Sequence, residues 1–359
     1  MRSDHDATVR REPHVSRRAA LAGSGALIAG LAGCTGGQSS DVAGDESGAT
    51  VGDEGSDDED APVAVASFFT FYDFARQIAE GTPVRVENLV PTGLHGHGWD
   101  PDPSITRDII DADAFITVGP DFQPWADRAI RTVRDDGADT NVINAREGID
   151  LIDLADTVED DEEVDSGKDP HFWLDPLRAQ ESVDNIAEGL TAIAPDHEAA
   201  FADNADAVNA ELAELDAEWE AIFEAADRDV VFLAAHNAFE YIGQRYGATI
   251  QPLVMNLAAE NDVRPADMRR AEDTIADNDI RHIGAAVFES RRPARQLRDE
   301  TDVEAYYPVT PYAGTTEEWV DRGWGYFEIA REINMKTFEI VLDAAEPETA
   351  FDEEWRNFE

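Results

Sequence analysis

The sequence predicts an α/β protein with two (β/α) lobes, each holding a mainly parallel sheet, joined by one long rigid helix. Two observations support this prediction. Short strand-like runs alternate with helical patterns before residue 145 and again after residue 229, an order typical of βαβ crossovers. Between these regions the chain is helical in pattern, and residues 200–226 contain no Gly or Pro.

The charge balance is the most unusual feature of the composition. The 359 residues include 28 Lys and Arg against 78 Asp and Glu, a formal net charge of -50, while 42% of the residues are hydrophobic. The hydrophobic fraction supports a proper core, and the acidity excludes a nucleic-acid-binding surface because phosphates would be repelled. The acids are spread along the whole chain, so they do not form one acidic tail. Molar salt shortens the Debye length to roughly 3 Å and screens the self-repulsion, so we expect a halophilic protein.

Residues 1–34 have the pattern of an export signal. Twin arginines, Arg17 and Arg18, precede a short apolar stretch that ends in Leu31-Ala32-Gly33-Cys34, and Cys34 is the sole cysteine. The stretch is too short to cross a bilayer, which takes ~20 apolar residues. Its end resembles a lipobox, so we expect a Tat-like lipoprotein signal, lipid attachment at Cys34 and anchoring at the extracytoplasmic face of the cell membrane. An uncleaved anchor helix and a cleaved signal with an incidental cysteine are the alternatives.

After the leader we expect a tether and then a first lobe. Residues 35–61 are mostly Gly, Ser, Asp and Glu, a composition that cannot bury enough apolar surface to fold. Residues 62–176 form the expected N-terminal α/β lobe. Its expected strands are 63–66, 84–90, 114–118 and 141–144, and its expected helices are 68–80, 105–112 and 124–135.

Residues 177–227 are predicted to be a helical connector, broken once at Pro195. Leu212, Leu215, Trp219 and Ile222 form an apolar stripe at helical spacing. A helix of ~27 residues is about 40 Å long, which suits a strut between two lobes. The C-terminal α/β lobe follows at residues 228–359. Its expected strands are 230–234, 249–254, 283–288 and 303–307, and its expected helices are 238–246, 264–278, 293–301 and 325–344.

Three histidines stand at positions that favour metal binding. His97 follows the second expected strand, His171 precedes the connector helices, and His236 stands where a strand of the second lobe turns into a helix. Ligands collect at the carboxyl ends of parallel strands, so a cleft between the lobes would bring His97 and His236 together. Three neutral imidazoles with one further oxygen ligand suit Zn²⁺, whereas a manganese site would prefer carboxylates. Any one histidine taken alone is more often a surface or hydrogen-bonded core residue.

The residues around these histidines resemble three motifs of the zinc/manganese substrate-binding proteins of ABC importers. The motifs are His97-Gly98-Trp99-Asp100-Pro101, then Asp169-Pro170-His171-Phe172-Trp173-Leu174-Asp175-Pro176, and finally His236-Asn237-Ala238-Phe239 running into Tyr246-Gly247. The likeness covers the chain from Pro62 to the expected C-terminal helix. It implies the metal-type periplasmic-binding-protein fold, with a metal held between the lobes by His97, His171 and His236. A histidine at the third position is similar to the zinc branch of the family.

Two departures from the family pattern concern the surroundings of the metal. Many members carry a fourth, carboxylate ligand in the loop after the last strands, but residues 308–314 contain no acid. The fourth ligand is therefore expected to be either water or His95. Zinc-type members also often have a His-rich acidic loop before Asp-Pro-His, whereas residues 158–165 are acidic without histidine.

The resemblance implies a receptor without chemical turnover. It would capture a divalent transition metal, Zn²⁺ or alternatively Mn²⁺, and deliver it to an ABC permease in the cell membrane. We expect a monomer that binds no nucleic acid. A manganese receptor or adhesin-type lipoprotein is one alternative. A zinc hydrolase is another, although the sequence has no His-Glu-x-x-His motif.

Overall fold

The computed structural model describes residues 61–96, 99–154, 167–255, 263–351 and 353–358. The predicted leader with Cys34, the predicted tether up to residue 60, His97 and the acidic stretch 158–165 lie outside the described residues. All elements below belong to one compact unit, residues 57–359.

The first lobe contains a four-stranded parallel sheet. Its strands are β1 (Val63–Ala66), β2 (Arg85–Asn88), β3 (Ala114–Thr117) and β4 (Asn141–Asn144), in the order β2-β1-β3-β4. Its crossover helices are α1 (Phe69–Ile78), α2 (Ile105–Asp111) and α3 (Pro124–Asp136). Every predicted strand and helix of this lobe is present, which confirms the βαβ prediction.

Both faces of this sheet are covered, so its central strands are apolar on both sides. Ala64 and Ala66 of β1 pack in a core with residues of α1, whereas Val65 of the same strand packs with residues of α2 and α3. This alternation follows from the period of two along a strand. It also explains why the central strands read as continuous hydrophobic runs.

The second lobe repeats the topology of the first. Its parallel strands are β5 (Val230–His236), β6 (Thr249–Val254), β7 (His282–Ala286) and β8 (Ala305–Val309), in the order β6-β5-β7-β8. Its crossover helices are α6 (Glu240–Tyr246), α7 (Pro265–Asp277) and α8 (Arg292–Glu300). In each lobe the strand order reverses beside the first strand, and ligands of open α/β sheets bind at such switch points.

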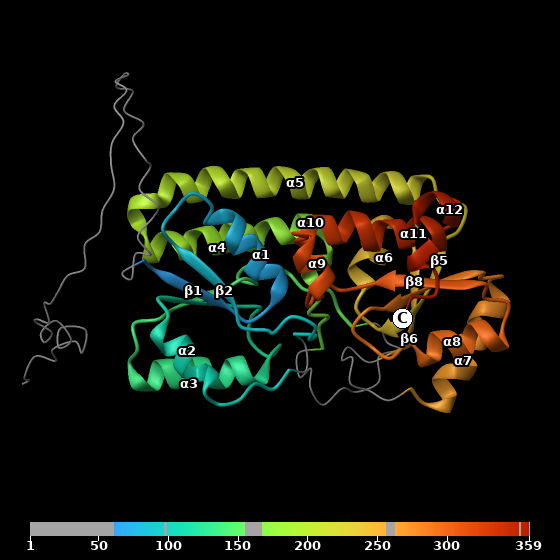
Figure 1. Cartoon of the computed structure of the whole chain (residues 1–359), viewed down its shortest axis with the longest axis horizontal. Coiled ribbons are helices and arrows are strands. Elements are labelled where there is room, and N and C mark those ends of the chain that lie inside the picture. The colour runs from blue at the N-terminus through green and yellow to red at the C-terminus, as the bar shows by residue number, and fades with distance from the viewer. Residues whose placement is uncertain (1–60, 97–98, 155–166, 256–262, 352, 359) are drawn as a thin grey trace, which may run out of the picture. The chain divides into compact units, whose positions relative to one another are not determined.

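The connector prediction is confirmed by two antiparallel helices. Helix α4 (Pro176–Ile193) starts with Pro at its first position after Asp175, whose side chain accepts a hydrogen bond from the Leu177 N–H. A 3-10 turn, Pro195–His197, leads into α5 (Glu198–Glu224), which has 27 residues. Figure 1 shows α5 running past the elements of both lobes.

Contacts at the two ends of α5 support its role as a strut. Near its start, the Asn204 side chain donates hydrogen bonds to the carbonyls of Ile78 and Glu80 in the first lobe. Near its end, Asp216 accepts a bidentate pair of bonds from Arg245, and Trp219 packs against Phe338, both in the second lobe. Helix α5 therefore makes contacts with both lobes and links them.

The C-terminal region differs from its prediction in two ways. The predicted helix 325–344 is present, but it consists of α10 (Tyr326–Ile329), a π-helical segment (Ala330–Met335) and α11 (Lys336–Val341). The short helices α9 (Glu317–Asp321) and α12 (Pro347–Ala350) were not predicted. Thr316 caps α9 by accepting from the Trp319 N–H, and two acids follow it, a start signal that the sequence does contain.

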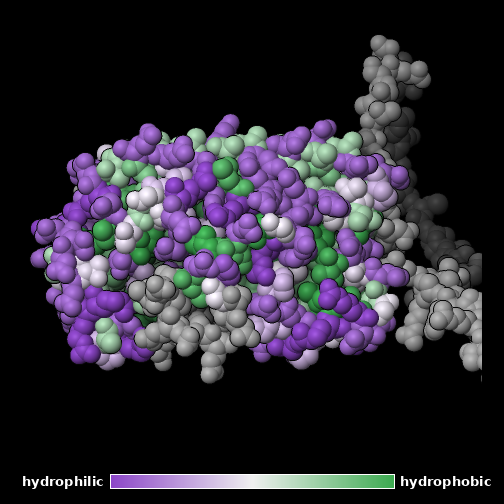
Figure 2. Space-filling view, turned by 180° about the vertical axis from the view of Figure 1, so that it is seen from behind, coloured by the Kyte–Doolittle hydropathy of each residue, from purple (hydrophilic) through white to green (hydrophobic). Residues whose placement is uncertain are grey.

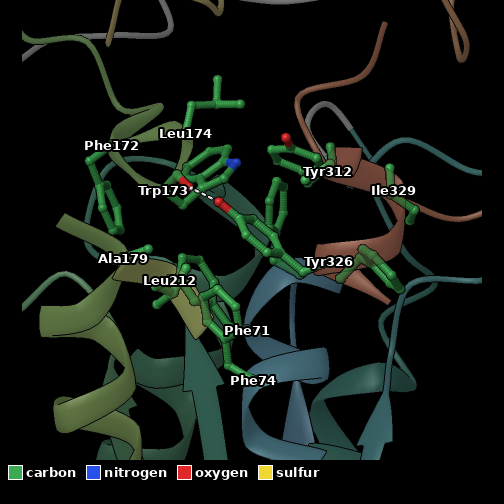
Figure 3. Packing of buried hydrophobic residues seen from close by; sticks show 14 of the residues in the cluster. Phe71, Phe74, Phe172, Trp173, Leu174, Ala179, Leu212, Tyr312, Tyr326 and Ile329 are labelled. Atoms are coloured by element: carbon green, nitrogen blue, oxygen red, sulfur yellow. Dashed lines mark hydrogen bonds between the residues drawn. The ribbon is translucent and has the colours of Figure 1, made fainter. Parts of the chain in front are cut away.

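One hydrophobic core runs through both lobes. The same cluster includes Phe71 of α1, Leu212 of α5, Leu233 of β5 and Phe338 of α11. Figure 3 shows its middle, where the Tyr326 hydroxyl donates a hydrogen bond of 2.8 Å to the backbone oxygen of Trp173. Because this core is continuous, the two lobes are packed as one body and not merely tethered.

The surface is polar. Figure 2 shows one face on which hydrophilic residues dominate and hydrophobic residues form separate small areas. Among the described residues, the exposed large hydrophobic side chains are Leu94, Leu177 and Val320. In that same part of the chain, no helix has the length and apolar character needed to cross a membrane.

Candidate metal centre

His171 sits in the loop that joins the first lobe to α4. It precedes a 3-10 turn, Phe172–Leu174, and its side chain is 1% exposed. Asp169 holds it twice: one carboxylate oxygen accepts from the His171 backbone N–H and lies 2.9 Å from the imidazole Nδ1. The Asp169 carboxylate therefore fixes both the backbone at His171 and the orientation of its imidazole ring.

The Asp169 segment is held from the second lobe. The Tyr241 hydroxyl of α6 donates to the Asp169 carbonyl at 2.8 Å and accepts from the Ile152 N–H at 3.1 Å. The Trp173 indole N–H donates to the Pro311 carbonyl at 2.7 Å. The His171 loop is thus fixed to the lobe that carries His236.

His236 is the last residue of β5, at the switch point of the second sheet. Its side chain is 1% exposed, and its Nδ1 lies 2.6 Å from a carboxylate oxygen of Glu289, which follows β7. An ionised carboxylate only accepts hydrogen bonds, so Nδ1 donates, and in a neutral imidazole the lone pair is then on Nε2. That Nε2 atom is buried and makes no hydrogen bond within the described residues.

The rings of His171 and His236 lie side by side although they come from different lobes. Their centroids are 5.6 Å apart. Two imidazoles bound to one tetrahedral zinc at Zn–N distances of about 2.0–2.1 Å have centroids roughly 5 Å apart. The observed separation is close to that distance.

His95 is the third histidine in this region. Its ring centroid is 5.6 Å from that of His236, with the two rings nearly perpendicular at 84°. The described ranges hold no group of three His, Cys, Asp or Glu side chains that would bind a metal by itself, and His97 lies outside those ranges. The structure thus brings together two of the three predicted ligands and adds His95 beside them.

Burial shapes the protonation of this cluster. It keeps the pKa of His171 well below the usual 6.5, and the neighbouring His236 lowers it further. Burial also raises the pKa of Asp169 to about 7, against the hydrogen bond from the His171 N–H and the charge of His236, which lower it. Metal ligation requires a neutral imidazole, and burial favours that form of His171.

Glu289 is the residue that the sequence reading missed. The expected place for an acid of the second lobe was the loop after β8, and that loop has none. The acid comes from the loop after the neighbouring strand β7 and contacts the imidazole of His236. The sequence did contain a signal for it, because Glu289 directly follows the predicted strand 283–288. Of the remaining histidines, His282 opens β7, and His197 is half-buried in the turn before α5.

Known proteins share this architecture. Among curated relatives, the high-affinity zinc uptake system protein ZnuA of Bacillus subtilis is 26% identical over 276 residues, 75% of this chain and 84% of that protein. The zinc-binding lipoprotein AdcA of Streptococcus pneumoniae is 28% identical over 300 residues, 80% of this chain and 58% of that protein. This chain therefore spans little more than half the length of AdcA.

Solved structures agree with the sequence relatives. The Zn(II)-bound ZnuA-like domain of Streptococcus pneumoniae AdcA superposes with a TM-score of 0.66 at 25% identity, covering 79% of this chain and 99% of that domain. The metal-dependent lipoprotein YcdH of Bacillus subtilis has a TM-score of 0.66 at 24% identity, covering 78% and 99%, which supports the fold. The profile of the family described as "Zinc-uptake complex component A periplasmic" (ZnuA) matches residues 64–339, and the chain belongs to that family.

Proposed function

We propose that this protein is a receptor of an ABC importer. It captures a divalent transition metal between its two lobes, and Zn²⁺ is the ion that it prefers. The observation that supports the proposal is the pair of buried imidazoles, His171 and His236, whose ring centroids lie 5.6 Å apart although the two residues come from different lobes. Each has its Nδ1 against a carboxylate, an arrangement that fixes the tautomer and orientation of metal-binding histidines. The zinc named for ZnuA and AdcA is consistent with this ligand chemistry.

His97 is the third ligand in this proposal. It belongs to the loop after β2, whose described part ends beside the cluster at His95 and Gly96. Three imidazoles favour zinc over manganese, because manganese prefers oxygen ligands. The metal is cargo, so the site binds and releases it without chemical turnover. The receptor acts at the extracytoplasmic face as a monomer, anchored through a lipid on Cys34, and delivers the ion to a membrane permease.

Metal content tests the binding function. Purified protein in molar salt is expected to bind one Zn²⁺ per chain with a preference over Mn²⁺, measured by elemental analysis and competition. His171→Ala and His236→Ala should each lose most of this binding. His197→Ala is the matched control, since His197 lies in the turn before α5 and contacts Phe201 rather than the cluster. Equal zinc content in all four proteins would reject the proposal.

Membrane attachment is tested separately. Cys34→Ala is expected to release the protein from the membrane fraction while leaving zinc binding unchanged. Retention of the variant in the membrane would reject lipid anchoring through Cys34. It would not bear on the proposal of metal binding.

A further inference from the structure

We infer that residues 310–315, a buried segment that we call the interlobe strap, set how slowly a bound metal leaves the protein. Thr70 and Asn334 are the positioning residues that hold this strap. The inference rests on the proposed function. It goes beyond that function because it assigns the rate of release to residues that are not among the proposed ligands.

The strap follows β8 as an irregular segment, and yet every one of its residues is buried. A buried loop has to satisfy its backbone polar groups without water. Pro311 has no N–H, and the Tyr312 N–H donates within the strap to the Thr310 hydroxyl at 3.2 Å. The carbonyl oxygens of the strap are therefore the groups that bind other parts of the protein.

Four of these carbonyls accept hydrogen bonds from the first lobe. The bonds run from the Gly93 N–H to Thr315 at 2.7 Å, from the Gly96 N–H to Ala313 at 3.0 Å, from the Thr70 hydroxyl to Tyr312 at 2.9 Å and from the Trp173 indole N–H to Pro311 at 2.7 Å. Trp173 stands two residues after His171, and the centroids of their rings are 5.3 Å apart. The strap thus joins the second lobe to the loop that carries His171.

Asn334 holds the strap from the side of the second lobe. It lies in the π-helical segment Ala330–Met335, a type of element often found at functional sites, and it is 0% exposed. Its side-chain amide accepts from the Thr310 N–H at 2.9 Å and donates to the Thr310 carbonyl at 2.7 Å. Because β8 is an edge strand, this amide takes the place of a neighbouring strand just beyond its end. Asn334 therefore fixes the point at which the strap leaves the sheet.

The conformation of the strap depends on these contacts. Tyr312 has a φ of 56°, a left-handed conformation that an aromatic residue rarely adopts and that persists only where its surroundings impose it. The fit is also close, since a Cβ at Gly314 would lie 2.1 Å from the Leu94 carbonyl oxygen. Loss of a hydrogen bond from Thr70 or Asn334 is therefore expected to let the strap relax and to weaken its hold on the first lobe.

The consequence concerns release more than capture. In the proposed receptor, an ion held by His171 and His236 leaves when these two residues move apart. The strap resists that movement because its hydrogen bonds join the same two parts of the chain. A weaker strap lowers the barrier to release but does not change the encounter with the ion, so the expected effect is on the dissociation rate.

Two variants of the full chain test this inference. Thr70→Val removes the hydroxyl that binds the strap, and Asn334→Leu removes both bonds to Thr310. Each is expected to speed zinc release by about 2–30-fold, the range for residues that act on a site without touching its ligand, and to leave the association rate unchanged. Release is measured by stopped flow with an excess of a chromophoric chelator that captures the zinc.

Thr337→Val is the matched control. Thr337 is 0% exposed, as Thr70 is, and its hydroxyl donates to the Pro308 carbonyl at 2.7 Å, but both of these residues belong to the second lobe. Thr337→Val and Thr70→Val should therefore lower the stability of the metal-free protein alike, measured by thermal unfolding, whereas only Thr70→Val should speed zinc release.

An unchanged release rate in Thr70→Val would overturn the inference and leave the receptor function intact. An equal acceleration in Thr337→Val would also overturn it, because the effect would then come from a general loss of stability. Thr70→Val decides the matter even if Asn334→Leu fails to fold. A wild type that binds no zinc would overturn both the receptor function and this inference, and that measurement is made first.

Discussion

At the scale of single residues, the centre depends on which imidazole nitrogen carries the proton. Asp169 and Glu289 each lie against an Nδ1 atom, so we propose that His171 and His236 would bind a metal through their Nε2 atoms. The two carboxylates differ in their surroundings. Asp169 is 2% exposed, whereas Glu289 is 14% exposed. We therefore expect substitutions of Asp169 and of Glu289 to affect metal binding in different ways.

Asp169 is expected to couple zinc binding to pH. In the metal-free protein burial raises its pKa to about 7, so below that pH the carboxyl is largely protonated. A zinc ion on His171 lowers this pKa by charge attraction, so binding at pH 6 releases a proton and affinity falls as the pH drops from 7 to 6. Asp169→Asn should release about one proton fewer, measured by calorimetry in buffers of different ionisation enthalpy. Equal proton release by both proteins would contradict this assignment.

Glu289 is expected to orient His236 without binding the metal itself. Glu289→Gln keeps the shape of the side chain but removes the charge that holds the Nδ1 proton, so zinc affinity should fall by about 10–100-fold. Glu304→Gln is a suitable control because Glu304 is an exposed acid of the same lobe, paired with Arg281. Competition against a chromophoric chelator measures both variants, and an unchanged affinity in Glu289→Gln would remove Glu289 from the centre.

At the scale of elements, the sequence predicted the order of strands and helices because local patterns determine them. The boundaries that differ have physical reasons. Strand β8 was expected to end before Pro308 but extends through it to Val309. A proline lacks the N–H that a central strand needs, but β8 is an edge strand, so Pro308 costs no ladder hydrogen bond. The π-helical segment 330–335 left no signal in the hydrophobic pattern.

The pairing of His236 with Glu289 was beyond the reach of sequence reasoning for a different reason. The two residues are 53 positions apart and meet because β5 and β7 are neighbours in the sheet. Sheet order was not predicted, so no contact between loops after different strands was predictable. The histidines themselves were found because each follows or precedes an element whose boundary the pattern marks.

Helix α5 provides a test at this scale. Trp219 is 1% exposed and packs against Tyr246 and Phe338. Trp219→Ala is expected to lower the free energy of unfolding by about 3–5 kcal/mol, measured by urea denaturation in molar salt. Glu220→Ala, on the exposed side of the same helix, should change it by less than about 0.5 kcal/mol. Equal effects of the two variants would show that α5 is not packed as described.

At the scale of the whole molecule, the centre exists because the two lobes are fixed together. The Tyr326 N–H at the start of α10 donates to Asp73 of α1 at 2.8 Å, and the Thr70 hydroxyl donates to the Tyr312 carbonyl at 2.9 Å. With the continuous core, these bonds hold the lobes in the arrangement that brings His171 beside His236.

A crystal structure of the zinc-loaded protein, with anomalous scattering at the zinc edge, tests the central claim most directly. The expected result is a single strong peak between the lobes, with the Nε2 atoms of His97, His171 and His236 each about 2.0–2.1 Å away. A zinc ion bound elsewhere, or one bound by histidines of a single lobe, would contradict the account.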